Sequence, residues 1–203
     1  MTPLEKLLNR SDKTEIKKLN KKAEVNRACY SDLHKLYKLL DNLINIVVII
    51  SSAIVAILTF ADIEYFRIIF KYINQESFTL LVGILASIIF IITLVQQYLN
   101  LSTKSDESEI AIKRITNFIR DTSSLKNEEN IDEKKFNQIL EDYKKINEEN
   151  PVIPDYIFIR AKSKLNQKIQ ISRYIDKYPM KKIRHIKKEL RNKSIEEIDK
   201  LLE

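Results

Sequence analysis

Residues Leu43 to Ala61 read LINIVVIISSAIVAILTFA, about nineteen residues without a charged side chain. A helix of this length, rising about 1.5 Å per residue, crosses a hydrocarbon core about 30 Å thick. Its Leu, Ile, Val and Phe residues favour insertion by about 4 to 7 kcal/mol, and one Asn, two Ser and one Thr offset only part of that gain. The stretch therefore predicts a first transmembrane helix over residues 43–61.

A second stretch of the same kind runs from Phe78 to Leu99 and reads FTLLVGILASIIFIITLVQQYL. It is also free of charged side chains, and Gln96, Gln97 and Tyr98 mark its exit into the headgroups. The alternative is a hairpin buried inside a soluble protein, which requires a domain to cover both stretches, and the rest of the chain is too polar for that. We therefore expect a second transmembrane helix over residues 78–99, with the lipid bilayer as the partner of both helices.

The composition favours helices throughout the chain. Glycine occurs once and proline four times in 203 residues. Turns and hairpins depend on glycine for positive φ angles, so a chain almost without it is poorly suited to β-structure. The predicted fold class is an all-α integral membrane protein with two transmembrane helices and a cytoplasmic helical bundle.

The positions of Lys and Arg around the spans predict the orientation. Basic residues are concentrated at the ends of the spans that lie away from the connecting loop. They are Arg27, Lys35 and Lys38 before the first span and Lys104, Lys113, Arg114 and Arg120 after the second. The outer loop, residues 62–77, has only Arg67 and Lys71. Both termini are therefore expected on the cytoplasmic side of the membrane.

Within that loop, a set of apolar residues recurs at helical spacing: Ile63, Phe66, Phe70 and Ile73. Two interpretations stay open, a short amphipathic helix lying on the outer headgroups and an ordinary connecting loop with an aromatic belt.

The polar remainder of the chain also carries apolar residues at helical spacing. We expect an N-terminal cytoplasmic amphipathic helix over residues 1–42, capped by Ser11 or Asp12. It should be continuous with the first span because neither Gly nor Pro lies between Pro3 and that span. A cytoplasmic helical region of three helices should occupy residues 100–178, with one helix beginning at Asp132 and another at Asp155. A basic C-terminal helix should follow Pro179, over residues 179–203. Paired against each other, these helices would form a small bundle.

Polar and small residues form two stripes within the predicted spans. In the first span Asn45, Ser52 and Thr59 lie seven residues apart and share one face. Two interpretations stay open for this stripe, helix packing and the wall of a pore in an oligomer, because two helices cannot enclose a channel alone. In the second span Thr79, Gly83 and Ser87 lie four apart and predict a ridge for close helix packing.

The C-terminal part is strongly basic. Between Arg160 and Lys193 there are thirteen Lys or Arg residues and two acids, within a chain of net charge +7. Three interpretations stay open: juxtamembrane attraction to anionic lipids, a site for an anionic ligand such as a nucleotide, and nucleic-acid binding. The candidate residues for anionic lipid or ligand binding are Lys177, Lys181, Lys182, Arg184, Lys187, Lys188 and Arg191.

The sequence gives no basis for catalysis, a metal or a cofactor. It contains no nucleophile elbow, phosphate-binding loop or His-Glu zinc motif. A single cysteine, Cys29, excludes an internal disulfide, and His34 and His185 are far apart in the chain. We therefore expect that the protein is not an enzyme.

The order of these parts resembles the SLATT family, the SMODS- and SLOG-associating two-transmembrane effector domains of bacteria. The match extends over about residues 20–170, from the helix RACYSDLHKLYKLLDN through both spans to FNQILEDYKKINEENP and the Pro-x-x-Pro element at Pro151 and Pro154. The resemblance implies an effector of prokaryotic conflict systems that is activated by a partner sensor, often a nucleotide second-messenger system encoded nearby. It also implies that active members form pores or disrupt the inner membrane, and it brings no catalytic residues. The basic tail after about Ser172 lies outside it.

Two hypotheses follow. The first is a membrane effector of antiphage defence that oligomerises with copies of itself and forms pores or disrupts the inner membrane when a partner sensor triggers it. The alternative is a membrane-anchored adaptor whose basic cytoplasmic bundle recruits an acidic partner or a nucleic acid. The second hypothesis predicts binding without ion leakage.

Overall fold

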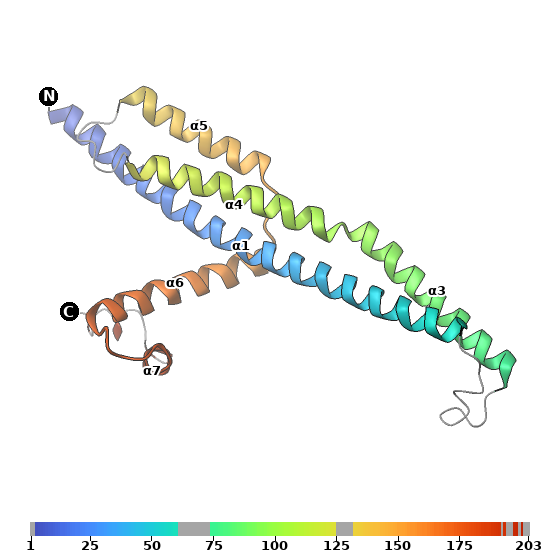
Figure 1. Ribbon diagram of the computed structural model, residues 1–203. Helices are drawn as coiled ribbons and strands as arrows, with labels where there is room; N and C mark the ends of the chain where they lie inside the picture. Colours follow the sequence, from blue (N-terminus) through green and yellow to red (C-terminus); the bar gives the residue numbers. More distant parts are fainter. Residues whose placement is uncertain are drawn as a thin grey trace. The chain divides into compact units, whose positions relative to one another are not determined.

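The computed structural model describes residues 3–60, 74–124 and 132–191, together with 193, 197, 198 and 200, and it describes the side chains of the first helix from Lys13 onward. Within these ranges the regular structure is helical and contains no strand (Figure 1). The expected all-α class is confirmed. The helices are α1 (Pro3–Phe60), α3 (Gln75–Leu99), α4 (Leu101–Ser124), α5 (Glu133–Glu149), α6 (Asp155–Lys177) and α7 (Ile183–Leu190).

Helix α1 is one continuous helix of 58 residues that contains the first apolar stretch. The expectation that the N-terminal helix continues into the span is confirmed. Its start differs from the prediction: α1 already begins at Pro3, so Ser11 and Asp12 lie inside the helix and cannot cap it. Proline suits a helix start, because its missing N–H would have no partner in the first turn.

Helix α3 begins three residues earlier than the predicted second span. The side chain of Asn74 accepts a hydrogen bond from the backbone N–H of Ser77 at 3.0 Å, which is the usual way an Asn satisfies a free donor at a helix start. Residues 75–77 therefore belong to the helix rather than to the outer loop. The apolar set from Ile63 to Ile73 lies outside the described residues.

Asn100 separates α3 from α4. Its φ of 46° and ψ of 47° place it in the left-handed region, and its backbone N–H donates to the carbonyl of Gln96 at 3.2 Å. Asparagine reaches this conformation more easily than most residues because its short side chain can bond locally. The backbone N–H of Lys104 then bonds to the Asn100 carbonyl at 3.1 Å, so α4 begins directly after the break.

The C-terminal segment differs from the single helix expected over residues 179–203. Helix α6 ends at Lys177, α7 covers Ile183–Leu190, and Arg191 lies in a turn. Pro179 has no backbone N–H to continue a helix, which accounts for the gap between α6 and α7. Beyond that turn, residues 197, 198 and 200 are helical.

The chain divides into two compact units, one formed by residues 1–32 and 108–203 and the other by residues 33–107. The first, which we call the charged unit, has a core of small and apolar side chains from four helices. Burial of such side chains is the main stabilising term in a bundle of this kind. Members of this core are Ile16, Ala23 and Cys29 of α1, Ala111, Ile115 and Phe118 of α4, Ile139 of α5, and Ile157 and Ala161 of α6.

Polar contacts connect the helices of the charged unit. Asn20 of α1 and Thr122 of α4 form a buried side-chain hydrogen bond. The guanidinium of Arg114 lies 2.9 Å from Glu149, which joins α4 to α5. The rings of Phe118 and Tyr143 pack with their centroids 5.4 Å apart at the same pair of helices. Helix α5 therefore runs alongside α4 (Figure 1).

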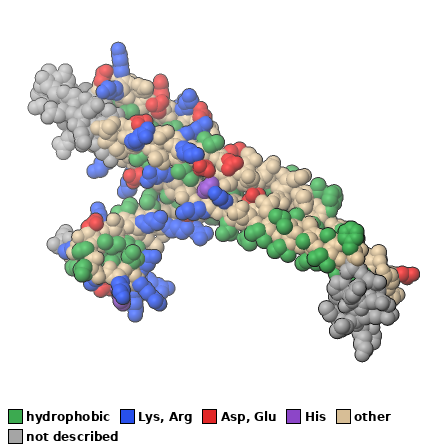
Figure 2. Space-filling model, in the orientation of Figure 1, with side chains coloured by type: hydrophobic (Ala, Val, Ile, Leu, Met, Phe, Trp, Pro, Cys, Tyr) green, Lys and Arg blue, Asp and Glu red, His purple; other side chains and the backbone are tan. Residues whose placement is uncertain are grey.

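The second unit, residues 33–107, is a hairpin of α1 and α3 whose outer surface is apolar. Ile49 is 67 % exposed, Ile57 63 % and Phe90 63 %. In the most apolar 18-residue segment of the first span no residue is buried. In the corresponding segment of the second span 6 % of the residues are buried. These helices are long and apolar enough to cross a membrane, and their exposure is opposite to that of core helices in a soluble protein. Figure 2 shows hydrophobic side chains over this hairpin.

Candidate functional site

The two membrane helices meet along a seam with a seven-residue repeat. On α1 the half-buried positions alternate by three and four residues, and on α3 the same spacing recurs. This is the pattern of helices that pack as an antiparallel coiled-coil pair. The α1 seam is Asp41, Ile44, Val48, Ser51, Val55 and Leu58, and the α3 seam is Phe78, Val82, Leu85, Ile89, Ile92, Gln96 and Leu99.

Asn45 fixes the register of the hairpin. Its side-chain carbonyl accepts a hydrogen bond from the Gln96 amide at 2.7 Å, and its own amide donates to Asp41 at 3.2 Å. Closer to the end of the unit, Nδ1 of His34 lies 3.0 Å from the Ser105 carbonyl and 3.1 Å from its hydroxyl. The two residue numbers of each contact add up to about 140, as they do along a pair of antiparallel helices. The register of α1 against the second half of the hairpin is therefore the same at both contacts.

With this register, the first polar stripe lies beside the seam rather than in it. Asn45, Ser52 and Thr59 each follow a seam residue by one position. The equivalent residues on α3 are Thr79, Ala86 and Thr93, which follow the seam residues Phe78, Leu85 and Ile92. In an antiparallel pair these positions of the two helices lie on the same side of the seam. We call these six residues the polar flank.

The opposite side of the hairpin has a different composition. The residues that precede every second seam residue, counted from Asp41 on α1 and from Val82 on α3, are large and aliphatic, and we call them the apolar flank. They are 37–50 % exposed. Gly83 and Ser87 continue the polar flank around the outside of α3. The apolar flank consists of Leu40, Val47, Ile54, Leu81, Ile88 and Val95.

The hydroxyl groups of this surface bond to their own helix. Thr59 donates to the Val55 carbonyl at 2.8 Å and Thr93 to the Ile89 carbonyl at 2.9 Å. Thr79 and Ser87 bond to carbonyls four residues earlier in the same way. Such local bonds lower the cost of placing a hydroxyl in lipid.

The ridge of Thr79, Gly83 and Ser87 is not packed against α1. A Cβ atom added at Gly83 would meet no atom within 4 Å, and Thr79 and Ser87 are exposed. The ridge is therefore open to contact from outside this chain. Sequence reasoning found the two stripes separately but missed Ala86 and Thr93, because their place on the flank depends on the pairing of α1 with α3.

The proline pair occupies the connection between α5 and α6. The Tyr30 hydroxyl of α1 donates to the Pro151 carbonyl at 2.6 Å. Pro154 directly precedes α6, and its carbonyl accepts from the N–H groups of Ile157 and Phe158. Further along α6, Lys164 lies 2.7 Å from Asp32 of α1. The proline element thus positions α6 against α1 within the charged unit.

Cys29 is fully buried between these helices. Burial, with a smaller contribution from Asp32, raises the pKa of its thiol to about 11. Since the thiolate is the reactive form, this cysteine is chemically protected. Its place in the core is that of a small apolar residue.

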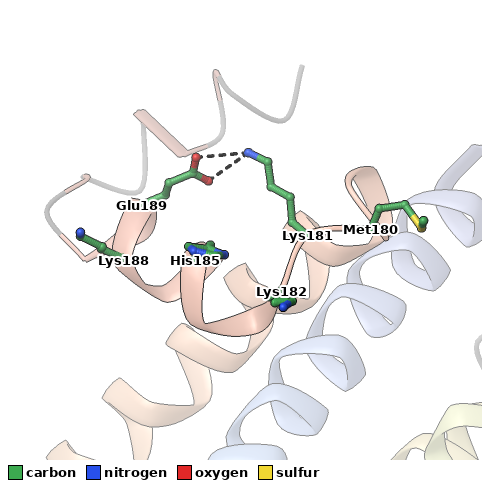
Figure 3. Close-up of a pocket in the computed structure, with 6 residues that line it drawn as sticks. All are labelled: Met180, Lys181, Lys182, His185, Lys188 and Glu189. Carbon is green, nitrogen blue, oxygen red and sulfur yellow. Dashed lines mark hydrogen bonds and ion pairs between the residues drawn. The ribbon is translucent and has the colours of Figure 1, made fainter.

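Among the predicted basic residues of the tail, Lys181 has the most contacts within the chain. Lys181 donates to the Tyr174 hydroxyl at 3.0 Å and to Glu189 at 3.2 Å, and it lies over the rings of Tyr174 and Tyr178. Figure 3 shows its ammonium group directed at the Glu189 carboxylate. Hydrogen bonds to Tyr174 and Glu189 raise the pKa of Lys181. The positive charge of Lys181 is therefore paired with the Glu189 carboxylate of the same chain.

The other six predicted basic residues have exposed side chains. Lys182 and Lys188 line the same hollow as Lys181, together with His185 (Figure 3). Lys187 and Arg191 face a different groove. Lys177 lies 6.0 Å from the Tyr178 ring centre, and Arg184 is exposed on α7.

An antiparallel hairpin of two exposed apolar helices, continuous with a charged helical unit, defines a two-span membrane protein. The model for the SMODS and SLOG-associating 2TM effector domain family 5 matches residues 12–188. The chain belongs to this family, which confirms the SLATT resemblance and implies a membrane effector of conflict systems. The searches of curated proteins and of solved structures gave no match.

Proposed function

We propose that this protein is a membrane effector of bacterial antiphage defence that permeabilises the inner membrane. In this proposal copies of the chain associate through their hairpins, with both termini cytoplasmic, and a partner sensor triggers the active state. The protein acts by rearrangement in the membrane and not by catalysis. The family supports the effector role, and the hairpin supports the way in which it acts.

The observation that carries the proposal is the difference between the two flanks of the hairpin. A hairpin that is surrounded by lipid on both sides has no need for polar residues on one side. Here Asn45, Ser52 and Thr59 come together with Thr79 and Thr93 on one flank, while the other is entirely aliphatic. Membrane helices place small and polar residues where they contact other helices or water.

In this proposal, a second copy of the same hairpin contacts the polar flank. The exposed Gly83 lets a neighbouring helix approach closely, since it adds no side chain to the surface. In a ring of hairpins, the polar flanks face neighbours or a central water path, and the aliphatic flanks face lipid. The hydroxyls of Thr59, Thr79 and Thr93 tolerate both surroundings, because they are already bonded to their own helices.

A paired set of variants tests this assignment. Asn45→Leu, Ser52→Leu and Thr59→Leu together remove polarity from the flank, and Val47→Leu with Ile54→Leu serves as the control on the apolar flank. We expect induced expression of the native protein and of the control to collapse the membrane potential, measured with a voltage-sensitive dye. The triple variant should need at least about tenfold more protein for the same effect, with equal amounts in the membrane fraction.

The polar-flank assignment fails if the triple variant depolarises cells as readily as the control. An unchanged elution volume in detergent for native protein and triple variant, at the size of one chain, would contradict the association of copies.

A second candidate function is supported by the exposed basic residues of α7. Lys182, Arg184, Lys187 and Lys188 are available for an acidic partner or a nucleic acid, as expected for a membrane-anchored adaptor. This function predicts capture of such a partner without leakage from liposomes. Leakage from protein-containing liposomes therefore separates it from the effector function.

A further inference from the structure

A groove of about 740 Å³ in the charged unit is lined by residues of α6 and α7 and by Arg191, Lys193 and Ile198. Its apolar surface includes Phe158 and Ile171 of α6 and Leu190 of α7, with the buried Ile198 at the far side. A volume of this size accommodates a ligand of a few hundred daltons. The groove is distinct from the hollow around Lys181.

Four cationic side chains line this groove: Lys162 of α6, Lys187 of α7, and Arg191 and Lys193 after it. Among the described lining residues there is no Asp or Glu to neutralise this positive charge. The hollow around Lys181 differs, because it contains Glu189 and that carboxylate is held by Lys181. Hydrogen bonds from Tyr174 and Lys181 lower the pKa of Glu189, and the charge of Lys193 makes a smaller contribution.

Gln170 provides an independent observation. Its side-chain carbonyl oxygen is buried and has no hydrogen-bond partner among the described residues, and the residue lines the groove. An unpaired buried acceptor costs about 1–3 kcal/mol, so such atoms usually mark a missing partner. A ligand that carries an N–H or O–H group would supply that partner if the Gln170 side chain, whose oxygen is covered in the structure, turned towards the groove.

We propose that this groove binds an organic phosphate. Its phosphate contacts the cationic side chains, its apolar or aromatic body lies on Phe158 and Ile171, and a donor group on it reaches Gln170. Arg191 can hold two phosphate oxygens at once, while the lysines contribute point charges. The site is independent of the polar flank, and Lys193 and Ile198 lie beyond the residues matched by the family model.

Two sources share this chemistry, a nucleotide and the headgroup of an anionic phospholipid, and a binding experiment distinguishes them. Full-length protein in phosphatidylcholine nanodiscs is titrated with ATP, GTP, short-chain phosphatidylglycerol and inorganic pyrophosphate, and heat of binding is measured. We expect one organic phosphate to bind at least about tenfold more tightly than pyrophosphate. A nucleotide preference identifies a soluble ligand, and a phosphatidylglycerol preference identifies the membrane lipid.

Charge-neutral variants locate the binding. Lys162→Gln with Arg191→Gln should weaken the preferred ligand by at least about tenfold. The control is Lys144→Gln with Lys145→Gln, which removes the same charge from exposed side chains of α5 and should change the affinity by less than twofold.

Gln170→Leu separates binding from folding. It removes an acceptor without a partner, so the unfolding temperature should stay the same or rise, while the affinity should fall several-fold. Equal affinity for pyrophosphate and for the organic phosphates overturns the proposal, as does equal loss in the α5 control. Absence of binding of all four probes at millimolar concentration overturns it as well.

Discussion

At the scale of single residues, the hydrogen bond from Tyr30 to the Pro151 carbonyl is the contact that connects the proline element to α1. Tyr30 is 4 % exposed, so Tyr30→Phe leaves a carbonyl without its donor in a poorly hydrated place. We expect a loss of about 1–2 kcal/mol in the free energy of unfolding. Denaturant titration in detergent measures it, and Tyr156→Phe, at a 65 % exposed position of α6, should change it by less than 0.5 kcal/mol.

The same contact predicts a dependence on pH. Burial, followed by the nearby Cys29, raises the pKa of Tyr30 to about 12 from an ordinary value of 10.0. Above pH 10 the unfolded chain loses this proton while the folded chain keeps it, so the stability of the native protein falls as the pH rises towards 12. The Phe variant lacks this titration. The difference between the two proteins should therefore shrink over this range, and a constant difference would contradict the assignment.

At the scale of secondary-structure elements, the break at Asn100 separates α3 from α4. A β-branched residue is strained in the left-handed region, so Asn100→Val should lower the free energy of unfolding by about 1–2 kcal/mol. Asn100→Gly should change it by less than 0.5 kcal/mol, because glycine adopts this conformation freely. If both variants unfold at the same temperature as the native protein, the backbone at this position is not left-handed in solution.

Most helices were predictable from sequence because their apolar residues recur with the helical period. The helices beginning after Asp132 and at Asp155, and the continuity of α1 into the membrane, follow from that period and from the prolines. The end of the second span at Leu99 was also predicted, but the left-handed backbone of Asn100 was not, since neither Gly nor Pro marks it. The end of α7 at Leu190 was also missed, because the charged residues that follow it are compatible with a longer helix.

The candidate sites depend on pairing between helices, and periodicity within one helix does not determine pairing. Asn45, Ser52 and Thr59 were predictable as one stripe, but their meeting with Thr93 required the register that the Asn45–Gln96 contact defines. Similarly, Lys187 and Arg191 were among the predicted binding residues. Lys162 and Lys193, which line the same groove, were not.

At the scale of the whole molecule, α1 supplies one continuous helix to both units. Its buried or half-buried positions in the charged unit include Ile16, Ala23 and Tyr30, and those in the hairpin include Tyr37 and Ile44, each seven residues after the last. Seven residues make almost two full turns, so all of these side chains project in nearly the same direction. The two contact surfaces of α1 are thus in phase.

This phase predicts how the protein tolerates changes in length. Seven residues inserted after Lys35, together with seven after Lys104 in the opposite helix, should preserve the unfolding temperature and depolarising activity. Two residues inserted at each of the same places rotate the following surface by about 200° and should abolish both. Equal tolerance of the two insertions, in thermal unfolding and in the voltage-dye assay, would show that the phase is irrelevant.

The unbroken course of α1 therefore restricts how such a chain can evolve. A loop absorbs insertions of any size, but a helix that serves two contact surfaces accepts only those that return its side chains to the original direction. Natural relatives that are longer or shorter between the charged unit and the bilayer should differ by nearly whole numbers of helical turns, for example by about seven or eleven residues, in both helices at once.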